Sequence, residues 1–355
     1  HLAMFDAVNS IELRYRPYLT ALPAAASTSK EAAAATSAGT VLASLNPQSA
    51  EEFRSAMAAY LATIPDSEAK TQGIKLGEAV AAKILEARAN DGADALDSYR
   101  PKTRPGVYVG TTAFVSTTWA KLKPFALTSQ SQFRPEPPVA LTSEQWAADY
   151  NEIKDLGAKD STKRTAQQTE DGRFWLITGP QSGDPIMRQV AMAKNMSVMD
   201  CARFMALVAV AAADAGIAVF DAKYTYEFWR PVTAIRNGDI DDNPATERDE
   251  TWQPLDSTPM HPEYPCAHCT ISGAVAAAVE AALGTAEIPE VSMTSPTAPG
   301  ITHGWTNIQA YNEEVSHARI WAGFHYRFSV RAGQDVGRKV GRYVVETYDS
   351  QGDRL

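Results

Sequence analysis

The stretch CARFMALVAVAAADAGIAVFDAKYTYEFW, residues 201–229, sets the expected fold. Its apolar residues continue over several helical turns. Asp214 and Gly216 interrupt the run before it reaches the roughly 20 apolar residues that cross a bilayer. The stretch therefore predicts a buried core helix that leads into an aromatic and basic segment.

Helical patterns occupy most of the remaining chain. Ala-rich segments with apolar residues at three- and four-residue spacing run over residues 29–45, 50–64 and 71–88. The pattern resumes in LTSEQWAADYNEIKDLG (residues 141–157) and DPIMRQVAMAKNMSVMD (residues 184–200). Alternating strand patterns are scarce. We therefore expect an all-α protein of packed helical bundles, forming a single unit over residues 1–355 with an N-terminal half, 1–170, and a C-terminal half, 171–355.

Residues 91–141 differ in composition from the helical segments. They are rich in Pro, Gly, Thr and aromatic residues, as in SYRPKTRPGVYVG and KPFALTSQSQFRPEPPVALT. This composition predicts a long ordered loop rather than a flexible linker. Loops of that length usually carry function or cover something.

Composition excludes some classes of partner. The chain has 355 residues and a net charge of -9, without a Lys/Arg-rich run, so we expect no nucleic acid partner. We also expect no transmembrane segment.

The three cysteines predict no disulfide framework, and a bridge between Cys266 and Cys269 is expected to be strained because they are so close in sequence. The helical pattern already present at His1 suggests that a leader has been removed.

The segment KYTYEFWRP, residues 223–231, brings the first chemical groups. Lys223 and Arg230 are seven residues apart, so on a helix both project from one face and could reach one anion. A solvated basic pair is the alternative interpretation. The surrounding aromatic residues favour burial, and a buried Lys and Arg need an anionic partner.

The segment HPEYPCAHC, residues 261–269, brings the second group. Its prolines stop a preceding helix, while CTISGAVAAAVEAALG predicts a helix that begins near Cys269 and ends at Gly284. Cys266, Ala267 and His268 are therefore expected at a helix N-terminus, where free N–H groups favour anions. Zinc binding is the alternative, but it usually needs a second cysteine pair.

The segment SHARIWAGFHYRFS, residues 316–329, brings the third group. Arg319 and His325 are six residues apart and do not share a helix face unless Gly323 loosens the turn or the two residues flank a ligand. His303, placed in a Pro/Gly/Thr loop, and His317 are predicted to have no functional role.

These three segments together resemble the signature of vanadium-dependent haloperoxidases and of the related type 2 phosphatidic acid phosphatases and bacterial acid phosphatases. In that superfamily the pattern is Lys, six residues, Arg-Pro; then Pro-Ser-Gly-His; then Ser-Arg, five residues, His, three residues, Asp. The chain matches its order and spacing in KYTYEFWRP, YPCAH and ARIWAGFHYRF. AMFDAVN and KPFALTSQSQFRP also resemble the soluble haloperoxidase branch, whereas the small phosphatases lack such an N-terminal half.

The resemblance implies a role for each matching residue. Lys223, Arg230 and Arg319 hold the oxygens of vanadate, with phosphate able to occupy the same site, and backbone N–H groups around Cys266 and Ala267 assist. His325 is the residue bonded to the central atom: vanadium as a metal ligand in a peroxidase, phosphorus in a phosphatase. His268 is the acid/base group.

Several positions depart from the family pattern. Cys266 stands where Ser is usual, and its thiol is open to oxidation by peroxide. Ala267 replaces Gly, and Ala318 replaces the Ser before the Arg. Ser329 replaces the Asp that supports the essential His, so His325 needs another acceptor or a backbone carbonyl.

Three functions remain open at this stage. The first is a vanadate-dependent haloperoxidase that uses hydrogen peroxide. His261 stands where the family's bromoperoxidases tend to place His, which implies bromide or iodide rather than chloride; a surface loop histidine is the alternative. The second is a soluble acid phosphatase acting on a phosphate monoester through a phosphohistidine, favoured by Cys266. The third is a non-catalytic oxyanion binder.

We expect a periplasmic or secreted location and consider a homo-oligomer.

Overall fold

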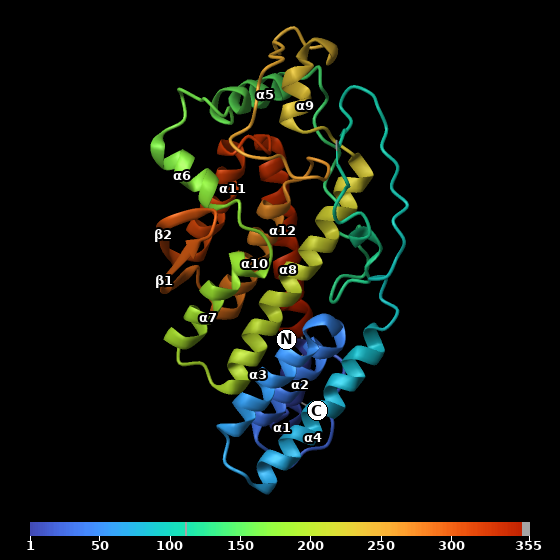
Figure 1. Cartoon of the computed structure of the whole chain (residues 1–355), viewed down its shortest axis with the longest axis vertical. Coiled ribbons are helices and arrows are strands. Elements are labelled where there is room, and N and C mark those ends of the chain that lie inside the picture. Colours follow the sequence, from blue (N-terminus) through green and yellow to red (C-terminus); the bar gives the residue numbers. More distant parts are fainter. Residues whose placement is uncertain (111, 350–355) are drawn as a thin grey trace. The chain divides into compact units, whose positions relative to one another are not determined.

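The computed structural model describes residues 1–110 and 112–349 (Figure 1). The described residues are mostly helical, which confirms the predicted helical-bundle class. They also form a two-stranded antiparallel sheet from β1 (Glu287–Ser295) and β2 (Ala298–Asn307), so the purely all-α expectation is wrong. A register shift between Glu287 and Val291 breaks the alternation of buried residues in β1, which is why the sequence pattern did not predict a strand.

The chain folds into two compact units whose ranges interleave. Unit 1 contains residues 1–91 and 191–209 and the C-terminal segment from residue 345; unit 2 contains residues 92–190 and 210–344. The single unit over residues 1–355, with its halves 1–170 and 171–355, stays a prediction.

Unit 1 is built around four helices that pack on one another: α1 (Leu2–Glu12), α2 (Lys30–Leu45), α3 (Ala50–Ala62) and α4 (Glu68–Arg88), with the 3-10 turn η1 (Pro47–Ser49). Ser29 caps α2 by accepting from the Ala32 N–H, as a Ser at that position predicts. The buried Asp6 carboxylate accepts from the N–H groups of Tyr18, Leu19 and Thr20, so it fixes the segment that follows α1.

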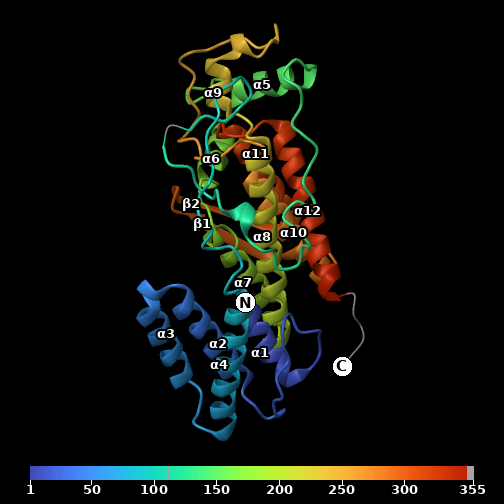
Figure 2. The ribbon, with the colours of Figure 1, turned by 90° about the vertical axis from the view of Figure 1, so that its right-hand side faces the viewer.

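Unit 2 carries the three motifs. Its elements, some of which continue into unit 1, are η2 (Trp119–Lys121), α5 (Glu144–Leu156), α6 (Ala166–Phe174), η3 (Pro180–Ser182), α7 (Asp184–Ala193), α8 (Val198–Tyr226), α9 (Pro231–Arg236), η4 (Gly238–Ile240), α10 (Ala267–Leu283), β1, β2, α11 (Ile308–Trp321) and α12 (Arg327–Asp349). In both views α8, α10, α11 and α12 gather into one bundle (Figure 2).

Helix α8 is the core helix expected from the opening stretch. It is long and apolar enough to cross a membrane by length and composition, but 78% of its most apolar window is buried inside the protein, as in a core helix. Its Asp214 is fully buried and accepts from the N–H groups of Phe125, Ala126 and Leu127. This carboxylate therefore ties the segment between α4 and α5 to the core helix.

Helices α10 and α12 pack with their backbones close together because α12 places Gly333, Gly337 and Gly341 on the shared face. A Cβ atom at Gly333 would stand 2.7 Å from the Cys266 carbonyl oxygen, and one at Gly337 would overlap the Thr270 carbonyl oxygen. Only glycine permits this approach. The contact fixes the start of α10, where the second motif lies.

Candidate oxyanion site

Three cationic side chains from separate elements are buried in unit 2. Lys223 lies in the last turn of α8, Arg230 immediately before α9, and Arg319 in the last turn of α11; each is at most 2% exposed. Burial lowers the pKa of Lys223 well below its ordinary value, and the nearby guanidinium of Arg230 lowers it further. Burial likewise lowers the pKa of Arg230 to about 10 and that of Arg319 to about 9. Burial, and at Lys223 and Arg319 also repulsion from Arg230, therefore disfavour the charged form of these groups, and an anion bound between them would offset both effects.

Backbone carbonyl groups hold these cations in place. Lys223 Nζ donates to the carbonyl oxygens of Pro262 and Glu263 at 2.9 and 2.7 Å. Arg230 donates to the carbonyls of His261 and Phe324, at 2.9 and 3.0 Å, and Arg319 donates to that of Trp175. Carbonyl oxygens orient a cation but do not cancel its charge.

The balance of charge in this site is positive. One fully buried carboxylate, Glu263, lies beside the three cations. The buried Arg319 Nε has no hydrogen-bond partner among the residues that the structure describes. A buried donor without a partner is costly, and so is an uncompensated buried charge. An oxyanion between the cations would accept from the unpaired donor and would compensate the positive charge, so the residues present fit vanadate or phosphate.

His325 presents one ring nitrogen to this site. It follows Gly323, whose φ of 80° ends α11 and whose Cβ, if present, would stand 2.5 Å from the Gly157 carbonyl oxygen. This turn brings His325 beside Arg230 although the two motifs are far apart in sequence. Arg230 Nη1 lies 3.1 Å from His325 Nε2, and Arg only donates, so Nε2 accepts and carries its lone pair toward the cations.

Glu263 supports His325 from the other side. Its Oε1 lies 2.8 Å from His325 Nδ1, which is therefore the protonated nitrogen, and it also accepts from the Tyr326 N–H. Burial raises the pKa of Glu263 to about 7, against the opposing effect of Lys223 and Arg230. Burial, together with the same cations, lowers the pKa of His325 well below its ordinary value.

Glu263 was not predicted as a site residue. The sequence left open which acceptor replaces the family's Asp at Ser329, and Glu263 is that acceptor. Its charge within the second motif, between Pro262 and Tyr264, was the available signal.

Cys266 and Cys269 form a disulfide at the start of α10, although the sequence predicted no disulfide framework and a strained bridge at this spacing. Cys266 is the N-cap residue and Cys269 lies three positions later, and residues at that spacing are neighbours on a helix surface. Both are fully buried, and the Cys266 sulfur also accepts from the Cys269 N–H at 3.2 Å. The free, oxidisable thiol expected at this position is therefore not present. Ala267 is the first residue of α10, so the helix ladder does not use its N–H.

The two other motif histidines lie beside the cations. His268 Nε2 stands 3.1 Å from the Ile177 carbonyl oxygen and therefore donates to it; burial, then Arg319, lower the His268 pKa to about 3. His261 Nδ1 lies 3.0 Å from Arg230 Nη2, and burial with Lys223 and Arg230 lowers its pKa well below the ordinary value. Both imidazoles are thus neutral near pH 7.

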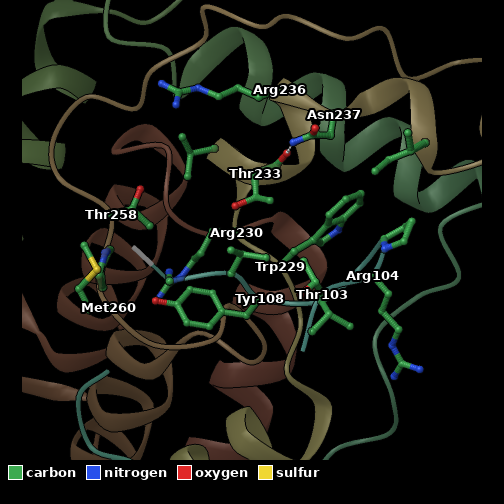
Figure 3. Close-up of a pocket in the computed structure, with 17 residues that line it drawn as sticks. Thr103, Arg104, Tyr108, Trp229, Arg230, Thr233, Arg236, Asn237, Thr258 and Met260 are labelled. Carbon is green, nitrogen blue, oxygen red and sulfur yellow. Dashed lines mark hydrogen bonds between the residues drawn. The ribbon is translucent and has the colours of Figure 1, made fainter. Parts of the chain in front are cut away.

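A cavity of about 570 Å³ adjoins the site, and Arg230 forms part of its wall. The Tyr108 ring and the Arg230 guanidinium lie side by side there, with Met260 and Thr258 nearby (Figure 3). The cavity offers a small molecule a place next to Arg230.

The remaining two predicted bystander histidines differ in position. His317 lies on a partly exposed face of α11, with Glu313 at 3.9 Å. His303 was expected in a loop, but it lies on β2 with a side chain only 8% exposed. The loop expectation is wrong because the Pro and Gly residues around it belong to the β1–β2 hairpin.

Comparisons with known proteins agree with these motifs. Residues 203–353 match a family model that is described as the VCPO second helical-bundle domain. The vanadium chloroperoxidase of Curvularia inaequalis is 29% identical over 181 residues, a match that covers 42% of this chain and 29% of that protein. The matched region thus spans less than a third of that relative. The predicted resemblance to this family is confirmed.

Solved structures share the fold over nearly the whole chain. A bacterial vanadium-dependent iodoperoxidase superposes with a TM-score of 0.82 at 22% identity, covering 98% of this chain and 88% of that one. A holo-type bacterial vanadium-dependent chloroperoxidase gives 0.78 at 19% identity, with 98% and 89% coverage. The apo-type chloroperoxidase gives 0.80 at 18% identity, with 98% and 91% coverage.

Proposed function

We propose that this chain, whose fold and motifs resemble those of the vanadium-dependent haloperoxidases, is an enzyme that oxidises halide with hydrogen peroxide. The observation that carries the proposal is the convergence of Lys223, Arg230, Arg319 and the Nε2 lone pair of His325 on one buried site of positive charge. This combination suits a tetrahedral oxyanion bonded through one imidazole nitrogen.

The residues would divide the work in the following way. Lys223, Arg230 and Arg319 would hold the vanadate oxygens and His325 Nε2 would be the ligand of the vanadium, while Glu263 fixes the His325 tautomer. When bound, vanadate supplies the Lewis-acidic centre at which peroxide is activated. His268 holds or releases the proton of the bound oxyanion, because an anion opposite Arg319 offsets the charge that lowers the pKa of this histidine.

We propose bromide or iodide rather than chloride as the halide. The support is His261, a neutral imidazole hydrogen-bonded to Arg230 in the place where the family's bromoperoxidases tend to carry His. Arg230 also borders the 570 Å³ cavity, which gives a halide or an organic acceptor a route toward the same guanidinium.

The alternatives are weaker than they were from sequence alone. Acid phosphatase activity was favoured by an oxidisable thiol at Cys266, but that sulfur is bonded to Cys269. A non-catalytic binder was suggested by the loss of the Asp that supports His325, but Glu263 supplies that carboxylate. The disulfide also supports the proposed periplasmic or secreted location, because such bonds persist in oxidising compartments.

Two assays on one metal-stripped preparation test this function. Bromide and iodide oxidation by peroxide is measured with and without vanadate, and p-nitrophenyl phosphate hydrolysis is measured without it. We expect halide oxidation only after vanadate is added, and loss of this activity in His325→Ala. Phosphate release that vanadate inhibits, without halide oxidation, would make the chain a phosphatase; vanadate binding without either activity would make it an oxyanion binder.

A further inference from the structure

A second, partly buried polar cluster lies in unit 2, outside the proposed oxyanion contacts. It contains His303 on β2, Glu170 and Asp171 on α6, and Glu314 on α11. The His303 ring stacks on Phe174 at a centroid distance of 3.9 Å, with an angle of 2° between the rings. The stacking and the 8% exposure of the side chain hold the imidazole in one orientation.

Glu314 fixes the proton on one nitrogen of this imidazole. Glu314 Oε1 lies 2.5 Å from His303 Nδ1, and the carboxylate also accepts from the indole N–H groups of Trp175 and Trp305, each at 2.9 Å. These three donors hold the Glu314 carboxylate in place, and its position opposite Nδ1 makes Nδ1 the donating nitrogen of the His303 ring. His303 Nε2 then points away from Glu314.

Two further carboxylates stand in front of Nε2. Glu170 Oε1 lies 3.4 Å from it and Asp171 Oδ1 lies 3.9 Å from it. In the part of the chain that the structure describes, Lys and Arg form no ion pair with Glu170, Asp171 or Glu314. Gln167 Nε2 donates to these same two oxygens, Glu170 Oε1 at 3.1 Å and Asp171 Oδ1 at 2.8 Å, but an amide brings no charge. Three carboxylates therefore gather around one imidazole without a Lys or Arg partner among the described residues.

We propose that Glu170, Asp171 and His303 form a binding site for a divalent transition-metal cation such as Zn²⁺. One ligand atom from each residue lies within 4.8 Å of the other two. In a tetrahedral site with metal–ligand distances of about 2.0–2.1 Å, neighbouring ligand atoms stand about 3.3 Å apart. The 3.4 Å contact to Glu170 matches this value, and the 3.9 Å contact to Asp171 must shorten by about half an ångström.

Glu314 completes the arrangement as the group that orients the histidine. A metal-binding histidine usually donates its other ring N–H to a carboxylate, as His303 Nδ1 does here. The bound cation would join α6 to β2 directly and to α11 through Glu314. It would thus act as a structural cross-link, and this inference does not depend on the proposed haloperoxidase activity.

Calorimetry and thermal unfolding test the site. The metal-stripped full chain is titrated with Zn²⁺ in the absence of vanadate and halide. We expect one equivalent to bind and the Tm to rise with Zn²⁺ concentration. Glu170→Gln should weaken this binding at least tenfold, because it removes one carboxylate ligand. The Glu170 side chain is one-third exposed, so the fold should tolerate the replacement. Glu314→Gln should weaken it by about 10–100-fold.

His317→Gln is the matched control, because His317 is a histidine of α11 with an acidic neighbour but without the converging carboxylates. It should leave the stoichiometry and affinity unchanged. The simplest competing arrangement is a protonated His303 that bridges the carboxylates without a metal. Failure of both Zn²⁺ and Mn²⁺ to bind, or binding that Glu170→Gln leaves unchanged, would overturn the proposal.

Discussion

The oxyanion site and the His303 cluster are buried polar groups of opposite charge in the same unit. The first places Lys223, Arg230 and Arg319 around one carboxylate. The second places three carboxylates around one imidazole. In both, a histidine donates through Nδ1 to a glutamate and directs Nε2 toward the charges that remain.

The difference teaches what each site needs from outside the chain. Neutral hydrogen-bond partners such as carbonyl and indole groups orient the charges in both places without cancelling them. On the two proposals, an anion would complete the first site and a cation would complete the second. Variants that remove charge from one site should leave ligand binding at the other intact.

The largest effect is expected from Lys223→Met, which keeps the length of the side chain and removes a fully buried charge. Oxyanion affinity should fall by about 100-fold or more, because the charge opposite a bound anion is lost. Zn²⁺ affinity should not change. Vanadate and Zn²⁺ titrations measure both, and exposed Lys339→Met serves as the control. Vanadate binding of normal strength in Lys223→Met would contradict the assignment.

Glu263→Gln should reduce vanadate-dependent turnover by about 10–100-fold, because His325 loses the anion that fixes its tautomer. Steady-state halide oxidation measures this loss. The exposed Glu290→Gln is the control. Equal activity of the two variants would show that another group orients His325.

Gly337→Ala should lower the free energy of unfolding by about 1–3 kcal/mol, because its Cβ overlaps the Thr270 carbonyl oxygen of α10. Gly273→Ala on the same interface should cost less, since its Cβ would stand 3.2 Å from the Gln334 carbonyl oxygen. Denaturant unfolding measures both. A larger loss in Gly273→Ala would contradict this view of the interface.

Stability of the vanadate-free protein should fall as the pH is lowered from 7 to 5. His261, His268 and His325 have lowered pKa values, so the unfolded chain takes up protons below about pH 6.5 while the folded chain does not. Each contributes at most about 1.4 kcal/mol per pH unit. Glu263, with its pKa raised to about 7, opposes this trend between its ordinary value and pH 7, but it is one group against three.

Thermal unfolding across this pH range checks the sign of the effect. His268→Gln should make the dependence shallower by the contribution of one group. A protein that becomes more stable on acidification would show that Glu263 dominates.

The smallest effect is expected from Cys266→Ser combined with Cys269→Ala. Serine is also an N-cap residue and is the residue usual in the family, so vanadate affinity should stay within about threefold of wild type. Titration under oxidising conditions measures it. A loss of tenfold or more would show that the disulfide itself positions the start of α10.

The sequence predicted the parts of this molecule that depend on local pattern. Apolar spacing predicted α2, α5 and α8. The meeting of Arg230 and Arg319 in one site did not follow from local pattern and was implied only by the family resemblance of the motifs. Glu263 and His303 were missed because their roles depend on residues distant in sequence, such as His325 for one and Glu170 for the other. The β1–β2 hairpin was missed because its irregular register hides the alternation of a strand.

Trp175 contacts both polar sites at once: its carbonyl accepts from Arg319, and its indole N–H donates to Glu314. Arg319 and Glu314 also lie five residues apart on α11. Any energetic coupling that passes through this tryptophan must be reciprocal, since binding free energies form a closed cycle. The factor by which a cation at the His303 cluster changes oxyanion affinity must then equal the factor by which the oxyanion changes the affinity of that cluster for the cation.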